Sequence, residues 1–253
     1  MDNLSRRWLL KLLASLLGAG LASACTRRLP GIETPATPMI PSPTEPLTPK
    51  PSPAIPDTIR LPEPRYESDV SIEETLLRRR SVRSYTGESL TLEEVSQLLW
   101  SAQGITADWG GRTAPSAGAT YPLETYLVVG DVEGLGRGVY KYRPREHELR
   151  RVLEGDKRAE LAAAALGQSW VRAGAVDIVF TALYERTTRR YGERGIRYVH
   201  MEVGHAAQNV YLQAVALDLG TVVIGAFHDH QVKRILNLPD DEHPLYIMPV
   251  GRR

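Results

Sequence analysis

Three arginines and a serine form the first group of residues whose chemistry is informative. Arg79, Arg80 and Arg83 lie within five positions, and Ser81 lies between them. Guanidinium groups and a hydroxyl at a helix end can hold a phosphate through charge-assisted, bidentate hydrogen bonds. Arginines at a helix C-terminus also stabilise the helix dipole without any ligand. Composition alone favours this second, structural interpretation of the cluster.

Two segments of small or apolar residues could let a flat ligand approach the backbone. One is a loop of four consecutive residues, in which successive N–H groups could address the carbonyls of a ring. The other is an apolar stretch, residues 221–227, that breaks at a glycine. An ordinary loop explains the first segment equally simply, and a core strand followed by a turn explains the second. The small and glycine-bearing positions are Pro115, Ser116, Ala117 and Gly118 in the first segment, and Ile224 and Gly225 in the second.

No acid–base pair stands out, so the catalytic residue stays unassigned. Weak candidates for groups that face a substrate are Tyr184, Arg197 and Tyr198, because residues 185–195 are polar and typical of a loop. Packing and surface charge explain these three residues equally well. The sequence also lacks the G-x-S-x-G, Walker and Rossmann glycine patterns.

The histidines do not predict a metal site. His200 and His205 would point about 140° apart on a helix, because each residue turns the helix by about 100°. His228 and His230 flank Asp229, which is more typical of a helix N-cap than of a metal ligand. We therefore expect no metal.

The elements that must position these residues follow no regular βαβ repeat, which indicates an α+β fold. Capping boxes at residues 71–74 and 91–94 predict two helix starts. The helix predicted at residues 198–219 stops at Gly220 and is apolar nearly all round, so it should be buried on most faces. The other predicted helices cover residues 157–166 and 229–238, and the predicted strands cover residues 124–129, 138–142, 147–153, 176–183 and 245–250.

Composition places the folded part of the chain after residue 64. The chain has 253 residues and 18 prolines, of which twelve lie between Pro30 and Pro64. A formal net charge of +1 gives no electrostatic reason to bind nucleic acid. The single cysteine excludes an internal disulfide framework and a cysteine-rich zinc site. No apolar run of bilayer length follows residue 24.

The N-terminus is typical of an export signal followed by a lipid anchor and a tether. Residues 1–24 contain Arg6 and Arg7 in a segment that resembles the twin-arginine motif, although a general secretory signal is the alternative. Cys25 follows Ala22-Ser23-Ala24 and resembles the lipidated cysteine of bacterial lipoproteins, with simple cleavage as the alternative. Residues 25–64 should then form an extended tether without sheet ladders, and residues 65–253 the folded domain.

Five segments in register resemble the FMN-dependent nitroreductase family. The closest branch is the SagB-type branch, which contains dehydrogenases that oxidise thiazolines and oxazolines in peptide natural products. The resemblance covers residues 72–253. The matching segments are Arg79-Arg80-Ser81-Val82-Arg83, Pro115-Ser116-Ala117-Gly118 with Tyr121-Pro122-Leu123-Glu124, Gly204-His205-Ala206-Ala207-Gln208-Asn209, Ile224-Gly225-Ala226-Phe227, and Pro244-Leu245-Tyr246 with Pro249-Val250-Gly251-Arg252.

The resemblance implies a mostly antiparallel central sheet flanked by helices, in an interlocked homodimer that binds FMN at the subunit interface. The arginine–serine cluster would hold the phosphate and ribityl chain. The loop at residues 115–118 would contact the isoalloxazine of the other subunit, and the backbone at Ile224 and Gly225 would face flavin N5. The helix at residues 198–219 would form much of the interface. Many family members continue into a further basic segment, for which Arg252 would substitute here.

The resemblance and the export signal together predict an FMN oxidoreductase in the bacterial cell envelope, lipid-anchored on the extracytoplasmic side. The usual family donor, NAD(P)H, is not expected outside the cytoplasm. The flavin would therefore be reduced by the substrate itself, a small molecule or a peptide azoline, or by an unidentified electron carrier. The alternative is a lipoprotein that binds flavin or a peptide without turnover.

Overall fold

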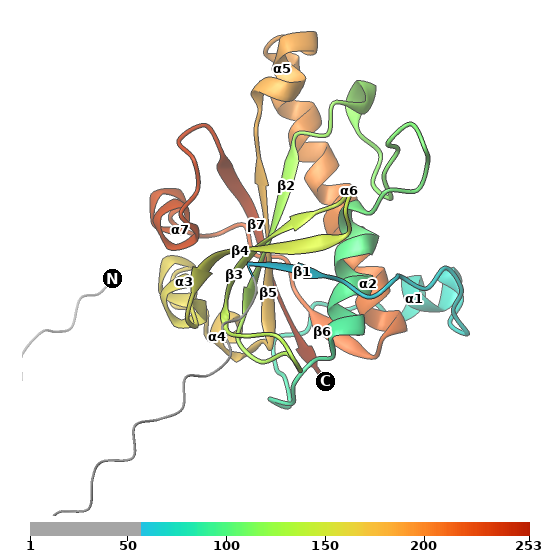
Figure 1. Ribbon diagram of the computed structural model, residues 1–253, viewed down its shortest axis with the longest axis vertical. Helices are drawn as coiled ribbons and strands as arrows, with labels where there is room; N and C mark the ends of the chain where they lie inside the picture. Colours follow the sequence, from blue (N-terminus) through green and yellow to red (C-terminus); the bar gives the residue numbers. More distant parts are fainter. Residues whose placement is uncertain (1–56) are drawn as a thin grey trace, which may run out of the picture. The chain divides into compact units, whose positions relative to one another are not determined.

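Seven strands form one sheet in the part of the chain that the computed structural model describes, residues 57–253. The strand order is β1-β4-β3-β2-β5-β7-β6, and all neighbouring strands are antiparallel (Figure 1). The strands are β1 (Thr58–Arg60), β2 (Leu123–Val129), β3 (Gly138–Arg143), β4 (Glu148–Glu154), β5 (Val176–Ala182), β6 (Leu219–Thr221) and β7 (His243–Arg252).

Helices cover both faces of this sheet (Figure 1), which confirms the predicted α+β class and the sheet flanked by helices. One apolar core lies between the sheet and helices α2 and α6, and a second lies between the sheet and α3, α4 and α7. The helices are α1 (Ile72–Arg78), α2 (Leu92–Gln103), α3 (Arg158–Ala164), α4 (Ser169–Ala173), α5 (Glu185–Tyr191), α6 (Arg194–Ala216) and α7 (Asp229–Leu236), with a short 3-10 helix, η1, at Ala117–Ala119.

Strand β5 shows why the sequences of the central strands are continuous apolar runs. All of its residues are buried, because helices pack on both sides of it. Ile178 and Phe180 point into the first core and Val179 into the second, as the alternation of a strand requires. The sequence therefore predicted this strand correctly to within one residue.

The N-terminus of α2 is fixed by the capping box that the sequence predicted. The Thr91 side chain accepts a hydrogen bond from the Glu94 N–H, and the Glu94 side chain accepts one from the Thr91 N–H. At α1 only half of the predicted box is present, since Ser71 accepts from the Glu74 N–H without a reciprocal bond.

The prediction that residues 25–64 form no sheet ladder is wrong at its C-terminal end. Residues Thr58–Arg60 form β1, which pairs with β4. Leu61 is only 3% exposed, and the Pro62 carbonyl accepts a hydrogen bond from the Ser96 hydroxyl of α2. The folded domain therefore includes residues before position 65.

Two predictions about the region around the long helix are also wrong. Residues 185–195 are not a loop, because Glu185–Tyr191 form α5 and α6 begins at Arg194. Helix α6 ends at Ala216, so Leu219 lies in β6. The helix is not apolar all round either: its buried face includes Val199, Val203, Val210 and Glu202, and its exposed face includes Ile196, His200, Met201 and His205.

Two shorter elements also differ from the prediction, one in its extent and one in its N-cap. The apolar stretch after Gly220 contributes to β6 only as far as Thr221, and Ile224 then makes an isolated bridge to Ile247 of β7. Asp229 does not cap α7, since it is the first helical residue and His228 occupies the N-cap without a side-chain cap bond.

The predicted signal, Cys25 and most of the tether lie outside the described residues. Within residues 57–253, no helix combines the length and apolar character needed to cross a bilayer.

Candidate functional site

The arginine–serine segment lies beside the end of β6. The Val82 N–H donates to the Thr221 carbonyl oxygen at 2.9 Å. The Tyr211 hydroxyl of α6 lies 3.1 Å from Ser81 Oγ and accepts a hydrogen bond from the Val223 N–H at 2.8 Å. Tyr211 therefore joins two of the segments that the sequence singled out, which are about 140 positions apart in the chain.

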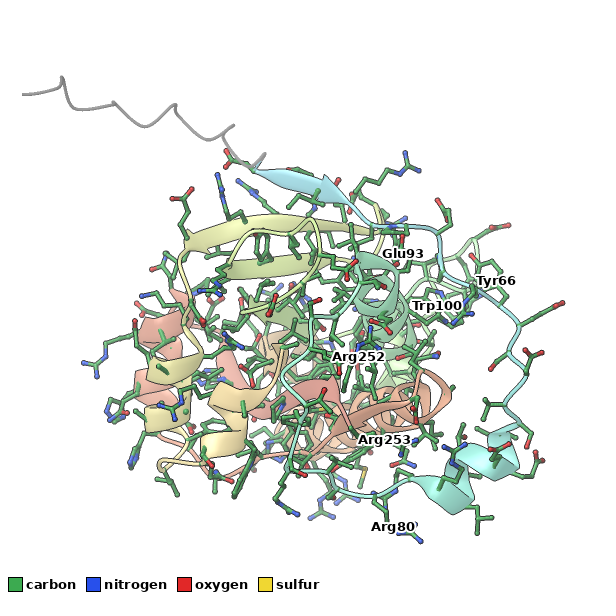
Figure 2. All side chains as sticks on the ribbon, turned by 90° about the horizontal axis from the view of Figure 1, so that it is seen from below. Tyr66, Arg80, Glu93, Trp100, Arg252 and Arg253 are labelled. Carbon is green, nitrogen blue, oxygen red and sulfur yellow. The ribbon has the colours of Figure 1, made fainter. Side chains whose placement is uncertain are left out.

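The arginines of this segment have different partners. Arg79 lies with its guanidinium carbon 5.1 Å from the centroid of the Tyr211 ring, and Arg83 lies 5.6 Å from the Trp170 ring. Neither forms an ion pair with any residue in the range 57–253. Arg80 instead donates to the carbonyl oxygens of Leu77 and Arg79 and projects from the edge of the domain (Figure 2).

The difference in partners indicates that these arginines have two kinds of role. Arg80 satisfies carbonyl groups at the C-terminus of α1, which is the structural interpretation of a basic helix end. Arg79 and Arg83 each contact an aromatic ring and form no ion pair, and Ser81 Oγ lies beside the Tyr211 hydroxyl. An anion such as a phosphate fits this set, because no carboxylate of the described chain neutralises the two cations.

The glycine-bearing segment after β6 has backbone donors that lack an acceptor among the described residues. The Ile224 N–H donates to the Ile247 carbonyl at 2.8 Å, so it is not available to a ligand. The N–H of Gly225 has no acceptor among the described residues, and Gly225 is exposed. A side chain at position 225 would contact only the Tyr246 ring, at 3.5 Å. Of the two backbone N–H groups expected to face a ligand, only that of Gly225 lacks a partner among the described residues.

The loop at residues 115–118 lies at a different place along α6. Its Ser116 hydroxyl accepts a hydrogen bond from the Tyr121 N–H, and the Gly118 carbonyl accepts one from Arg190 of α5. Gly118 has φ of 60°, and a Cβ there would lie 2.5 Å from the Tyr191 hydroxyl, so only glycine fits. The Pro115, Ala117 and Gly118 positions are exposed or half-buried at the surface.

Glu202 is a functional candidate that the sequence did not reveal. Its side chain is 2% exposed on α6, and its Oε1 atom has no hydrogen-bond partner among the described residues. Burial raises the pKa of Glu202 from 4.5 to about 7, although Ser116 and Arg112 oppose the shift. A carboxyl group that titrates near neutrality next to the loop at residues 115–118 could hold or release a proton there.

The two predicted portions of the site are separated within one chain. Ser81 contacts Tyr211, whereas Ser116 acts on Glu202. These two α6 residues are nine positions apart, which corresponds to about 13 Å along a helix. One protomer therefore brings the arginine–serine segment next to Thr221 and Val223, whereas Ser116 interacts with Glu202, nine positions away from Tyr211 on α6.

Arg252 has a structural partner, which corrects its expected role in binding a phosphate. Its guanidinium makes a bidentate ion pair with both carboxylate oxygens of Glu94 at 3.0 Å and donates to the Ser89 carbonyl. It therefore ties the last strand to the N-terminus of α2. We leave Arg252 out of the candidate site.

The weak catalytic candidates do not converge on one point. The Tyr184 hydroxyl lies 2.6 Å from His200 Nε2, and burial raises the pKa of Tyr184. Arg197 lines a shallow surface hollow together with His200. Tyr198 packs edge-on against Tyr191 of α5, away from that pair. Nothing in this arrangement assigns a catalytic role to any of the three.

A family comparison decides the identity of this fold. Residues 76–252 match the family described as the nitroreductase family, which is more than half of the chain. The chain belongs to the nitroreductase family.

Individual members of the nitroreductase family support this assignment. A Methanocaldococcus jannaschii protein described as a nitroreductase is 51% identical over 197 residues, covering 78% of this chain and 98% of the relative. The crystal structure of a Ralstonia eutropha protein described as a nitroreductase superposes with a TM-score of 0.70 at 30% identity, covering 78% of this chain and 90% of the other.

Two more distant nitroreductase-family relatives have a named activity or belong to a named complex. The FMN reductase (NADPH) of Bacillus subtilis is 26% identical over 192 residues, covering 70% of this chain and 64% of the relative. A chain of the Escherichia coli microcin synthetase McbBCD complex, with truncated pro-MccB17 bound, is 26% identical with a TM-score of 0.59 and covers 76% of each chain. The family resemblance read from the five sequence segments is confirmed.

Proposed function

We propose that this nitroreductase-family chain is an FMN-dependent oxidoreductase. One observation carries the proposal: Arg79 and Arg83 flank Ser81 at the surface without any acidic partner in the described chain. The phosphate of FMN would supply the missing negative charge, and bidentate bonds from the two guanidiniums would orient it. When bound, FMN supplies two-electron hydride chemistry at N5, and the protein supplies position and electrostatics.

The backbone after β6 would receive the flavin ring. Gly225 has a free N–H and no side chain, so the edge of a flat ring can approach it. Tyr211 fixes the distance between this backbone and the phosphate-binding segment, because it bonds both Ser81 and Val223. Gly225 is therefore the position that we assign to flavin N5.

The loop at residues 115–118 would complete the site from a partner subunit. Within one chain Ser116 of this loop interacts with Glu202, which lies about 13 Å along α6 from Tyr211, the residue that contacts Ser81. A homodimer could bring the partner's copy of the loop over the flavin of the first subunit. The exposed face of α6, which carries Ile196 and Met201, offers apolar surface for that contact.

Glu202 would hold a proton beside this loop. Its carboxyl group is neutral over most of the range below pH 7, because burial disfavours the charged form. Ser116, a residue of this loop, and Arg112 both stabilise the ionised form of Glu202. We propose that Glu202 takes up or releases a proton at the site during a redox cycle.

We propose that the substrate that reduces the flavin is a small molecule or a peptide azoline, which donates its hydride directly. Two points support this proposal: the likeness to a chain of a microcin synthetase complex, and the predicted export of the protein, since reduced nicotinamides are not expected outside the cytoplasm. A carrier of the cell envelope would accept the electrons.

We also propose that the protein is exported and anchored. Residues 1–24 would be the twin-arginine signal, Cys25 the lipidated first residue of the mature protein, and the proline-rich segment after it a tether. A single acyl chain binds membranes only marginally, so stable anchoring needs multiple acylation of the kind found in bacterial lipoproteins.

Anaerobic reduction of the purified protein tests the oxidoreductase function. The expected result is bleaching of a flavin spectrum by a chemical reductant, followed by reoxidation with organic acceptors at rates above that of free FMN. A protein that binds FMN but reoxidises no faster than free FMN would instead be a flavin-binding protein without turnover.

A further inference from the structure

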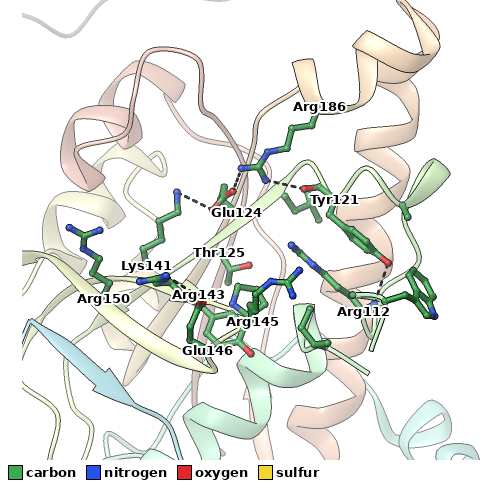
Figure 3. A pocket seen from close by; sticks show the side chains of 17 residues that line it. Arg112, Tyr121, Glu124, Thr125, Lys141, Arg143, Arg145, Glu146, Arg150 and Arg186 are labelled. Atoms are coloured by element: carbon green, nitrogen blue, oxygen red, sulfur yellow. Dashed lines mark hydrogen bonds and ion pairs between the residues drawn. The ribbon is translucent and has the colours of Figure 1, made fainter. Parts of the chain in front are cut away.

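A second pocket, lined by cations, lies outside the residues considered above for FMN. It has a volume of about 650 Å³, and none of the expected FMN-binding residues lines it. It is formed where the end of the β3–β4 hairpin faces the segment between α2 and η1 (Figure 3). A volume of this size suits a small organic ligand.

Charge is unevenly distributed in this pocket. Six of its side chains are cationic and two are acidic. Lys141 and Arg186 both pair with Glu124, and Arg143 pairs with Glu146. The three remaining cations, Arg112, Arg145 and Arg150, form no ion pair with any residue that the structure describes.

Arg112 is the most strongly fixed of these three cations. Its Nη1 donates to Gln103 Oε1 at 2.8 Å, and its guanidinium carbon lies 4.6 Å from the Tyr121 ring centroid. Its Nε atom is buried without a hydrogen-bond partner among residues 57–253. Burial lowers the pKa of Arg112. A half-buried cation that forms no ion pair gains from a bound anion, which would supply the missing negative charge.

The rest of the wall suits a flat apolar body. Tyr121, Trp109 and Tyr142 contribute aromatic surface, and Ile105 and Leu123 contribute aliphatic surface. Trp109 is 74% exposed, so its ring is available to a ligand at the pocket mouth. Aromatic surfaces of this kind favour stacking or edge contacts with a planar ligand.

We propose that this pocket binds a small planar organic anion, with its charged group on Arg112 and Arg145 and its ring against Tyr121. Ala119 and Tyr121 follow directly after the loop at residues 115–118. The pocket therefore adjoins the loop that we assign to flavin contact. As a statement about substrate class the inference rests on the proposed function, whereas binding of the anion itself requires no flavin.

Calorimetric titration of the purified, oxidised protein tests this inference, with the FMN content of each sample measured separately. The probes are 2-naphthoate and its neutral analogue 2-naphthamide, which share a ring system and differ in charge. We expect naphthoate to bind at least tenfold more tightly than naphthamide. We expect Arg112→Gln to remove most of this preference.

Because Arg112 has structural contacts, a second variant carries the test independently. Arg145→Gln combined with Arg150→Gln alters only exposed side chains and should weaken naphthoate binding at least fivefold. Arg172→Gln, which removes an exposed charge on α4 outside the pocket, should leave the affinity unchanged. Equal affinities for naphthoate and naphthamide, or unchanged naphthoate binding in the double variant, would overturn the proposal.

The two proposals fail separately in this experiment. Protein that retains no FMN but still prefers naphthoate contradicts the proposed cofactor and leaves the anion pocket standing. Protein that retains FMN and shows no preference for the anion contradicts the pocket alone.

Discussion

At the scale of single residues, ion-pair partners separate the arginines that we propose to bind a ligand from structural ones. The sequence presents Arg79, Arg80, Arg83 and Arg252 as one class of basic residue. In the folded chain, Arg80 bonds carbonyl groups of α1 and Arg252 bonds Glu94, whereas Arg79 and Arg83 have no acidic partner among the described residues. A sequence cannot show this distinction, because the partners are set by folding.

Replacement of Arg83 by alanine should weaken FMN binding by about 1.5–3 kcal/mol, which is roughly ten- to a hundredfold in affinity. The reason is the loss of one charge-assisted partner for the phosphate. Fluorescence titration with FMN measures the change. Arg80→Ala is the matched control and should change the affinity much less, because its guanidinium serves the helix end. Equal losses in the two variants would refute this separation of roles.

Glu202 should make the stability of the protein depend on pH. Its pKa is raised from 4.5 to about 7, so the folded state keeps a proton that the unfolded state releases in this interval. The associated stability is complete below pH 4.5 and is lost as the pH rises through 7.

Glu202→Gln removes this loss, since glutamine does not ionise. The free energy of unfolding of the variant, relative to wild type, should rise by roughly 2–3 kcal/mol between pH 5 and pH 8. Urea denaturation at the two pH values measures this difference. A difference that is the same at both pH values would show that Glu202 titrates as an ordinary exposed glutamate.

At the scale of helices and strands, the sequence best predicted the elements that have a clear capping motif or apolar run. The capping box at Thr91 and the apolar run of β5 gave α2 and the central strand nearly to the residue. Strand β1 was missed because its three residues lie in a proline-rich segment and depend on pairing with β4. Helix α5 was missed because its sequence is polar, and its position is set by packing on α6.

The site could be predicted only where sequence motifs carry it. The arginine–serine segment lies next to the segment that precedes Gly225, whereas Tyr211, which bonds both Ser81 and Val223, and Glu202 were not singled out for this role. Both lie on the buried face of α6, where a tyrosine or a glutamate gives no periodic signal. The cationic pocket escaped prediction because its walls come from segments far apart in the sequence.

The first strand tests where the folded domain begins. Leu61 follows β1 and is 3% exposed in the core, so Leu61→Ala should lower the free energy of unfolding by about 2–5 kcal/mol. Leu77→Ala is the control, because Leu77 is 75% exposed and should change stability by less than about 0.5 kcal/mol. Chemical denaturation of both variants provides the comparison. A Leu61 effect as small as that of Leu77 would place the domain boundary after position 64, as the sequence first indicated.

At the scale of the whole molecule, the proposed lipid anchor predicts where the protein is found in the cell. Cys25→Ser should move the protein from the membrane fraction to the soluble fraction and leave flavin binding unchanged, because the residues proposed to bind flavin are far from it in the sequence. Fractionation of expressing cells with mass spectrometry of the mature N-terminus makes the measurement. Wild-type protein that is soluble and carries an unmodified Cys25 would leave simple secretion as the explanation.

The central claim is that this nitroreductase-family chain binds FMN between two copies of itself. Titration of the flavin-free protein with FMN, with the bound fraction measured by fluorescence and the particle mass by light scattering, tests it most directly. We predict saturation at one FMN per protomer in a particle of twice the protomer mass. A monomeric particle, or a protein that does not saturate with FMN at micromolar concentration, would contradict the account.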